Sequence, residues 1–211
     1  MKKKHWISIF AIILVLVAIS IFNFILNFKL IKDVKNYKAL SEFFEQTVTL
    51  NETLLANLFG QSLLSSGMVL KDIHVTNEQG SSVRLKTLFD NNPKLVLRIS
   101  EINCMTCIDS SLKYIEKYKN IIGHQNIIVL ASYKRQQDVH TFKRISQVSL
   151  EIFNTGDITL GLPIENENAP YMFVTNDGLI VQSLFLPEKT MPLLSDMYFK
   201  IVIHRFFPNK K

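Results

Sequence analysis

The chain has 211 residues, of which 47% are hydrophobic, and it carries a formal net charge of +6. This length accommodates one ordinary globular domain and an accessory segment, and it excludes two independent domains of typical size. Lysines that flank an apolar segment supply much of the positive charge, and Arg205, Lys210 and Lys211 are typical of a frayed basic tail. The charge therefore gives no indication of a nucleic-acid partner.

The apolar segment spans residues 6–28 and contains no charged side chain. At about 1.5 Å per residue, a helix of this length crosses the ~30 Å hydrocarbon core of a bilayer. No small-residue cleavage site follows it, so residues 1–28 predict a short tail and an uncleaved, single-pass transmembrane anchor. Lysines precede the segment at positions 2–4 and also follow it. We interpret the first cluster as a signal-anchor start, which places the N-terminus in the cytoplasm and the rest outside it.

Residues 29–66 form the next region, a predicted helical stalk. Apolar residues recur there at steps of three and four, the period of an amphipathic helix. Thr47, Val48 and Thr49 are poor helix formers, so one long helix or two shorter ones fit the pattern, ending at Gly60 or Gly67. The apolar stripe either packs on the globular domain or pairs with a second copy as a coiled coil.

Residues 67–211 form one predicted domain with alternating strands and helices. We expect a hairpin over 69–76 and 83–85, buried strands at 95–99 and 126–131, a helix capped by Asp138, and a strand at 148–153. A hairpin with an Asn-Asp-Gly turn follows over 170–181, and a last helix follows Pro187, with Thr190 as a possible cap. This order predicts an α/β fold.

Cys104 and Cys107 are the only cysteines, and two residues separate them at the start of a helical pattern. The free backbone N–H groups and the dipole at a helix N-terminus favour a thiolate there. We therefore expect Cys104 to be the nucleophile and Cys107 to resolve the mixed disulfide.

Two other interpretations of the cysteine pair are weaker. A static disulfide would close a very short loop and remove little entropy from the unfolded chain. A zinc site needs two more soft ligands, but the five histidines, at positions 5, 74, 124, 140 and 204, have no ligand spacing. The sequence therefore predicts no metal site, and it indicates no cofactor.

The segments VLKDIHVTNEQGSSVRLKTLFDNNPKLVLRISEINCMTC and PYMFVTNDGLIV together resemble the thioredoxin-like superfamily, and more narrowly its membrane-anchored redoxin branch. The resemblance covers about residues 67–207. It implies a thioredoxin-like fold, with a central mixed sheet flanked by helices behind the anchor and stalk. It also implies thiol-disulfide oxidoreductase activity on protein thiols and disulfides, in a domain on the outer, periplasmic side of the bacterial cytoplasmic (inner) membrane.

The same resemblance assigns roles to particular residues. Pro170 would be the cis-proline facing the cysteines, and Ala169 would offer backbone hydrogen bonds to a substrate segment, which Met105 and Thr106 would also contact. The family often has a tryptophan before the first cysteine, where this chain has Asn103, and a proline between the cysteines, which this chain lacks.

Arg98 falls near the position where ordinary thioredoxins carry a buried acid. The carboxylate next along the chain is Glu101, and our hypothesis is that it accepts the proton of Cys107.

Two alternatives to an exchange enzyme are a tethered binding or redox-switch module without turnover and a thiol peroxidase. A reductase in an oxidising compartment would also need a transmembrane electron donor.

Overall fold

The computed structural model describes residues 2–89 and 92–208, with side chains described at all of these positions except 2–19 and 44. The chain forms two compact units, Met1–Leu55 and Ala56–Lys211. Among the described residues, no helix is long and apolar enough to cross a membrane. The side chains of residues 6–19, most of the predicted anchor, lie outside the described part, so the anchor stays a prediction.

One long helix, α1, runs over Lys2–Ser65, so the stalk is one helix and not two. It ends before Gly67, whose φ of +80° suits a residue without a side chain, whereas Gly60 lies within the helix. In the second unit, Leu58 packs on the domain core and Ser62 Oγ donates to Leu184 O at 2.9 Å. The last turns of the stripe therefore pack on the domain, and a coiled coil in the first unit stays a prediction.

The second unit is built on a seven-stranded mixed sheet with the strand order β2-β1-β5-β4-β3-β6-β7. Strands β3, β4 and β5 are parallel to one another, and the other pairs are antiparallel. Six consecutive residues of β3 are buried, as expected for a central strand covered on both faces. The strands are β1 His74–Thr76, β2 Ser82–Arg84, β3 Lys94–Ser100, β4 Ile127–Ser132, β5 Ile152–Asn154, β6 Tyr171–Thr175 and β7 Gln182–Phe185.

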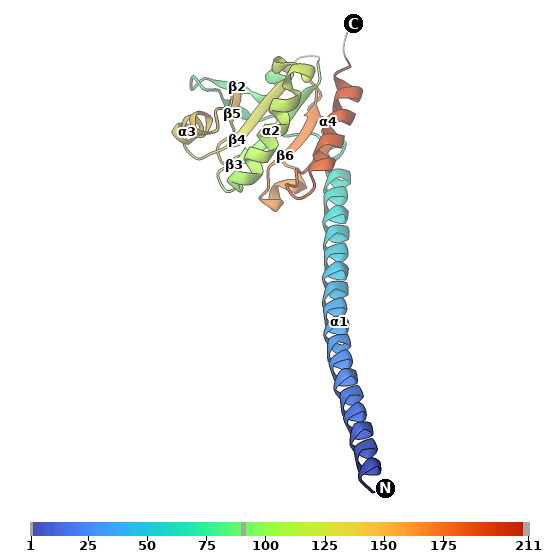
Figure 1. Ribbon diagram of the computed structural model, residues 1–211. Helices are drawn as coiled ribbons and strands as arrows, with labels where there is room; N and C mark the ends of the chain where they lie inside the picture. Colours follow the sequence, from blue (N-terminus) through green and yellow to red (C-terminus); the bar gives the residue numbers. More distant parts are fainter. Residues whose placement is uncertain (1, 90–91, 209–211) are drawn as a thin grey trace. The chain divides into compact units, whose positions relative to one another are not determined.

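Three helices pack on one face of this sheet: α2 Met105–Ile122, α3 Gln136–Ser146 and α4 Pro192–Phe206. In Figure 1, α2 crosses in front of β3 and β4, and α4 lies beside β6. The other face is covered by the end of α1, by the segment around Leu160 and by the 3-10 helices η1 Leu85–Leu88 and η3 Pro163–Glu167. A third 3-10 helix, η2 His124–Asn126, precedes β4. The predicted mixed sheet flanked by helices is confirmed.

Several local predictions were wrong in detail. The last hairpin forms, but its return strand is β7, which begins at Gln182. Residues 179–181 pair instead with the start of the domain, where Val181 N donates to Met68 O and Gly67 N donates to Val181 O. The helix α3 begins after Arg135, not at Asp138, which instead lies in the first turn and pairs with Arg135. Likewise, the N-cap residue of α4 is Met191 and not Thr190.

The expected cis-proline is also wrong for this structure. All peptide bonds of the described residues are trans, including the one between Ala169 and Pro170. Most X-Pro bonds in proteins are trans, because the trans form is favoured by about 0.5–1 kcal/mol.

Candidate dithiol site

The two cysteines lie where β3 gives way to α2. A tight turn joins these elements: Asn103 N donates to Ser100 O at 3.1 Å, and Ser100 N donates to the Asn103 side chain at 2.7 Å. Cys104 is then the N-cap residue of α2, and its carbonyl accepts hydrogen bonds from the N–H groups of Cys107 and Ile108 at 3.0 and 3.1 Å. The turn therefore fixes the first cysteine at the positive end of a helix.

Cys104 is exposed, and its sulfur has an unusual set of neighbours. The Thr106 hydroxyl lies 3.0 Å from Cys104 Sγ. This contact is the largest cause that lowers the pKa of Cys104, and the thiol and backbone N–H of Cys107 lower it further, to about 7. Donors to a sulfur stabilise its thiolate form. Much of Cys104 is therefore ionised near neutral pH.

Cys107 has the opposite electrostatic environment. It is partly buried, and its pKa is raised above the ordinary value, mainly by burial and then by its interactions with Cys104. Two charged residues act more weakly: Lys189 lowers the pKa of Cys107 and Glu188 raises it. Since one cysteine is exposed and acidified while the other is shielded and kept protonated, the pair has the asymmetry that thiol-disulfide exchange requires.

Glu188 and Lys189 come from the loop between β7 and α4, and sequence reasoning missed both. The Glu188 carboxylate accepts hydrogen bonds from the backbone N–H and the hydroxyl of Thr190, at 3.3 and 3.2 Å. These bonds fold the loop at the start of α4. No motif marks the loop, and it lies about 80 residues beyond the cysteines, so only the tertiary fold reveals that it acts on Cys107.

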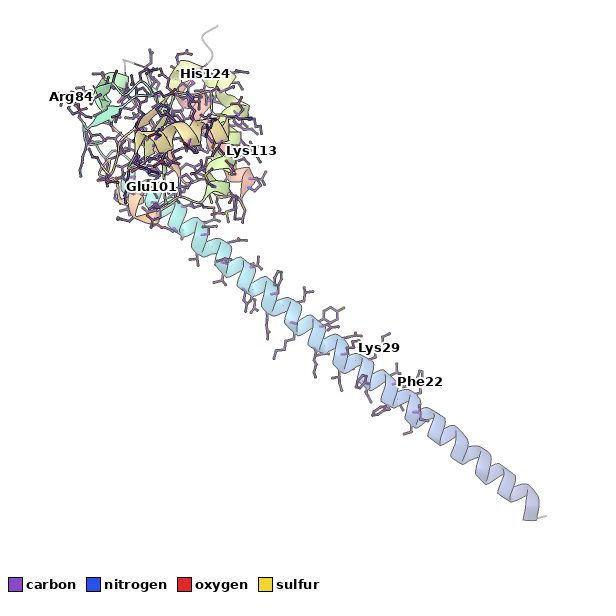
Figure 2. The ribbon with its side chains drawn as sticks, turned by 90° about the vertical axis from the view of Figure 1, so that its left-hand side faces the viewer. Phe22, Lys29, Arg84, Glu101, Lys113 and His124 are labelled. Carbon is purple, nitrogen blue, oxygen red and sulfur yellow. The ribbon has the colours of Figure 1, made fainter. Side chains whose placement is uncertain are left out.

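The structure places Glu101 in the turn after β3. Its carboxylate accepts a hydrogen bond from the backbone N–H of Lys134 at 3.3 Å and lies 3.9 Å from the Lys134 ammonium. Figure 2 shows Glu101 at one end of the domain and His124, which follows α2, near the other end. Glu101 is thus at the end that carries the cysteines, but the carboxylate found to act on the pKa of Cys107 is that of Glu188. The role of Glu101 as proton acceptor stays a prediction.

The pairing of β3 with β6 brings the remaining predicted residues to this end of the sheet. Arg98 is opposite Tyr171, so Ala169 and Pro170 come just before β6, where the neighbouring strand β3 runs into the cysteine turn. Ala169 lines a cavity together with Asn103, the residue before Cys104. Met105 is 45% exposed at the start of α2.

Comparisons with known proteins rest on structure alone. No family model and no curated protein sequence matches the chain. A protein from Chlorobium tepidum, assigned as a thiol:disulfide interchange protein DsbE, superposes with a TM-score of 0.52 at 10% identity, covering 66% of this chain and 99% of that one. A thiol:disulfide interchange protein from Bacteroides sp. gives a TM-score of 0.49 at 14% identity, covering 70% and 94%. With its mixed sheet and its dithiol at the start of α2, the chain has the thioredoxin-like fold.

Proposed function

We propose that this protein is a membrane-tethered thiol-disulfide oxidoreductase that exchanges disulfides with protein substrates through Cys104 and Cys107. The observation that carries the proposal is the opposite perturbation of the two sulfurs, with the pKa of Cys104 lowered to about 7 and that of Cys107 raised. A static disulfide or a buried structural thiol does not require an exposed, acidified sulfur.

The exchange follows from these roles. The Cys104 thiolate attacks one sulfur of a substrate disulfide, forms a Cys104–substrate disulfide and releases the other substrate sulfur as a thiolate. Cys107 then loses its proton and attacks the Cys104 sulfur, which releases the reduced substrate and leaves a Cys104–Cys107 disulfide. The same steps in reverse oxidise a substrate dithiol. The direction depends on the reduction potentials of the two partners.

The surface around Cys104 suits a polypeptide substrate. Ile102, two residues before Cys104, is 65% exposed, and Met105, directly after it, is 45% exposed. Exposed apolar side chains beside a reactive sulfur provide contact area for an extended or unfolded chain. Flexible Met side chains adapt to several partners.

The tether and the compartment are the second part of the proposal. The uncharged residues 6–28 and the lysines at positions 2–4 support a single-pass anchor with the domain on the outer side of the bacterial cytoplasmic membrane. As a reductase there, the protein would need a transmembrane electron donor to restore its dithiol. Labelling of an epitope at Lys211 by an impermeant reagent in intact cells tests this placement, and absence of labelling would put the domain inside.

Turnover separates the proposed function from its alternatives. The full-length chain should accelerate the reduction of a protein disulfide by a small dithiol, and Cys104→Ser should abolish this activity. Turnover of hydrogen peroxide instead would indicate a thiol peroxidase. Activity with neither substrate would indicate a binding or switch module.

A further inference from the structure

A small cavity opens beside the cysteine turn. Its volume is about 180 Å³, and its rim includes Ile102, Asn103 and Ala169. Its inner wall includes Arg98, Glu165 and Tyr171. The rim residue Ile102 is largely exposed, whereas Arg98 and Tyr171 are only 5% and 2% exposed. The cavity therefore leads from the surface next to Cys104 to a buried polar floor.

Two charged side chains in this floor offset each other. Arg98 Nη2 lies 3.6 Å from Glu165 Oε1, and Arg98 also donates to Thr155 Oγ1 at 2.8 Å and to Ile158 O at 3.3 Å. The Glu165 carboxylate accepts three further hydrogen bonds, from the backbone N–H groups of residues 160–162 at 2.9–3.3 Å. The pair is thus held rigidly, and the floor carries no net charge.

The third group in the floor is incompletely satisfied. The Tyr171 hydroxyl is buried and makes no well-formed hydrogen bond among the described residues, although Arg98 and Glu165 lie close enough to act on its pKa. Burial raises the pKa of Tyr171 far above its ordinary value, so the hydroxyl stays neutral and keeps its proton. A buried hydroxyl without a well-formed hydrogen bond is costly, and a group that hydrogen-bonds to it recovers that cost.

We propose that this cavity is a specificity subsite that binds an uncharged hydrogen-bonding side chain, a carboxamide or a hydroxyl, which the substrate presents next to its reactive cysteine. The Tyr171 hydroxyl donates to that side chain. This inference rests on the proposed function and adds a substrate class to it.

Geometry and charge both support this choice of ligand. Asn103 borders the cavity and directly precedes Cys104, so residues beside a substrate sulfur attached to Cys104 lie near the rim. A charged side chain would enter a floor whose two charges already offset each other, and it would lose its hydration without gaining a counter-ion. An apolar side chain would leave the Tyr171 hydroxyl unsatisfied.

The test uses the full-length chain carrying Cys107→Ser and peptides with a single cysteine activated as a disulfide with thionitrobenzoate. Attack of the Cys104 thiolate on the peptide sulfur forms the mixed disulfide and releases the coloured thionitrobenzoate anion. The peptides carry Gln, Leu, Glu or Lys beside the cysteine. We expect the Gln peptide to react about tenfold faster than the others, the effect of one buried hydrogen bond.

Two tyrosine variants provide the matched comparison. Tyr171→Phe deletes the hydroxyl in the cavity and should reduce the preference for Gln to less than about twofold. Tyr198 also has a buried hydroxyl without a partner among the described residues, but it lies on α4 in the other core cluster. Tyr198→Phe should therefore keep the preference.

Each further outcome decides the proposal. Equal rates for all four peptides would overturn the subsite and indicate that the cavity holds only ordered water. A preference that survives Tyr171→Phe, or a faster reaction of the Glu or Lys peptide, would also overturn it. In all these cases the reaction of Cys104 leaves the proposed function intact. If Cys104 reacts with no peptide, both proposals fail.

Discussion

Replacement of Thr106 by Val tests the main cause of the Cys104 acidity. Val keeps the shape of the side chain but removes the hydroxyl that lies 3.0 Å from Cys104 Sγ. This hydroxyl is the largest contribution that lowers the pKa of Cys104 from 9.0 to about 7. We therefore expect the variant to have a pKa above 7, with the contacts to Cys107 still holding it below 9.0.

The magnitude follows from the thiolate fraction. With a pKa of about 7, roughly half of Cys104 is ionised at pH 7, and loss of the whole effect would leave roughly one molecule in a hundred ionised. Because the contribution of Cys107 remains, we expect the reaction of Cys104 at pH 7 to slow by about fivefold to tenfold.

The assay is the rate of alkylation of Cys104 against pH, in chains that carry Cys107→Ser, where the Ser hydroxyl replaces the Cys107 thiol as a donor and the backbone N–H of residue 107 remains. The rate should rise with pH as the thiolate forms, with a midpoint near 7, and Thr106→Val should move the midpoint upward. Thr141→Val is the control, because the Thr141 hydroxyl donates only to the backbone of α3, to Gln137 O at 3.0 Å. If Thr106→Val leaves the midpoint unchanged, the hydroxyl does not stabilise the thiolate and the reasoning fails.

Three further changes test the structure. Glu188→Gln should lower the pKa of Cys107, because the carboxylate raises it. The variant should therefore release the substrate from Cys104 faster, measured as the decay of the mixed disulfide. A slower decay would mean that Glu188 acts as a base. Arg98→Met should reduce the free energy of unfolding by roughly 3 kcal/mol, since it breaks a buried ion pair. Arg135→Met breaks an exposed ion pair and should reduce it by less than about 1 kcal/mol. Urea unfolding measures both variants, and equal losses would contradict the burial argument. Gly123→Ala should cost about 1–2 kcal/mol in the same assay, because φ is +90° at this position; an unchanged stability would show that the backbone relaxes there.

The parts of the fold that could be predicted from the sequence are those specified locally. The buried run at 95–99 predicted β3 within one residue at each end, and the helical spacing after Cys104 predicted the start of α2 at the cysteine pair. Each element is indicated by a single short stretch of sequence, an apolar run for β3 and helical spacing for α2. By contrast, residues 179–181 pair with residues 67–70 at the beginning of the domain. No local sequence pattern predicts a contact between segments so far apart in the chain.

The candidate site divides in the same way. The spacing of Cys104 and Cys107 identified the reactive pair, because both residues lie on one turn of one helix. Tyr171 lies on β6 and Glu188 in the loop after β7, so their roles depend on strand order. Glu101 was proposed as the proton acceptor of Cys107 because it is close along the chain. The carboxylate found to act on the pKa of Cys107 is that of Glu188, which is close only in the folded structure.

The position of Arg98 connects these observations. It lies in the buried part of β3, and its guanidinium pairs with Glu165. A guanidinium does not deprotonate in proteins, so this position cannot accept a proton from Cys107. The Cys107 proton leaves toward solvent or toward a carboxylate elsewhere, and the charge of Glu188 raises the pKa of Cys107 and so favours its protonated form. In this chain the buried position thus belongs to the floor of a cavity, and burial and Cys104 set most of the pKa of Cys107, with smaller contributions from the loop between β7 and α4.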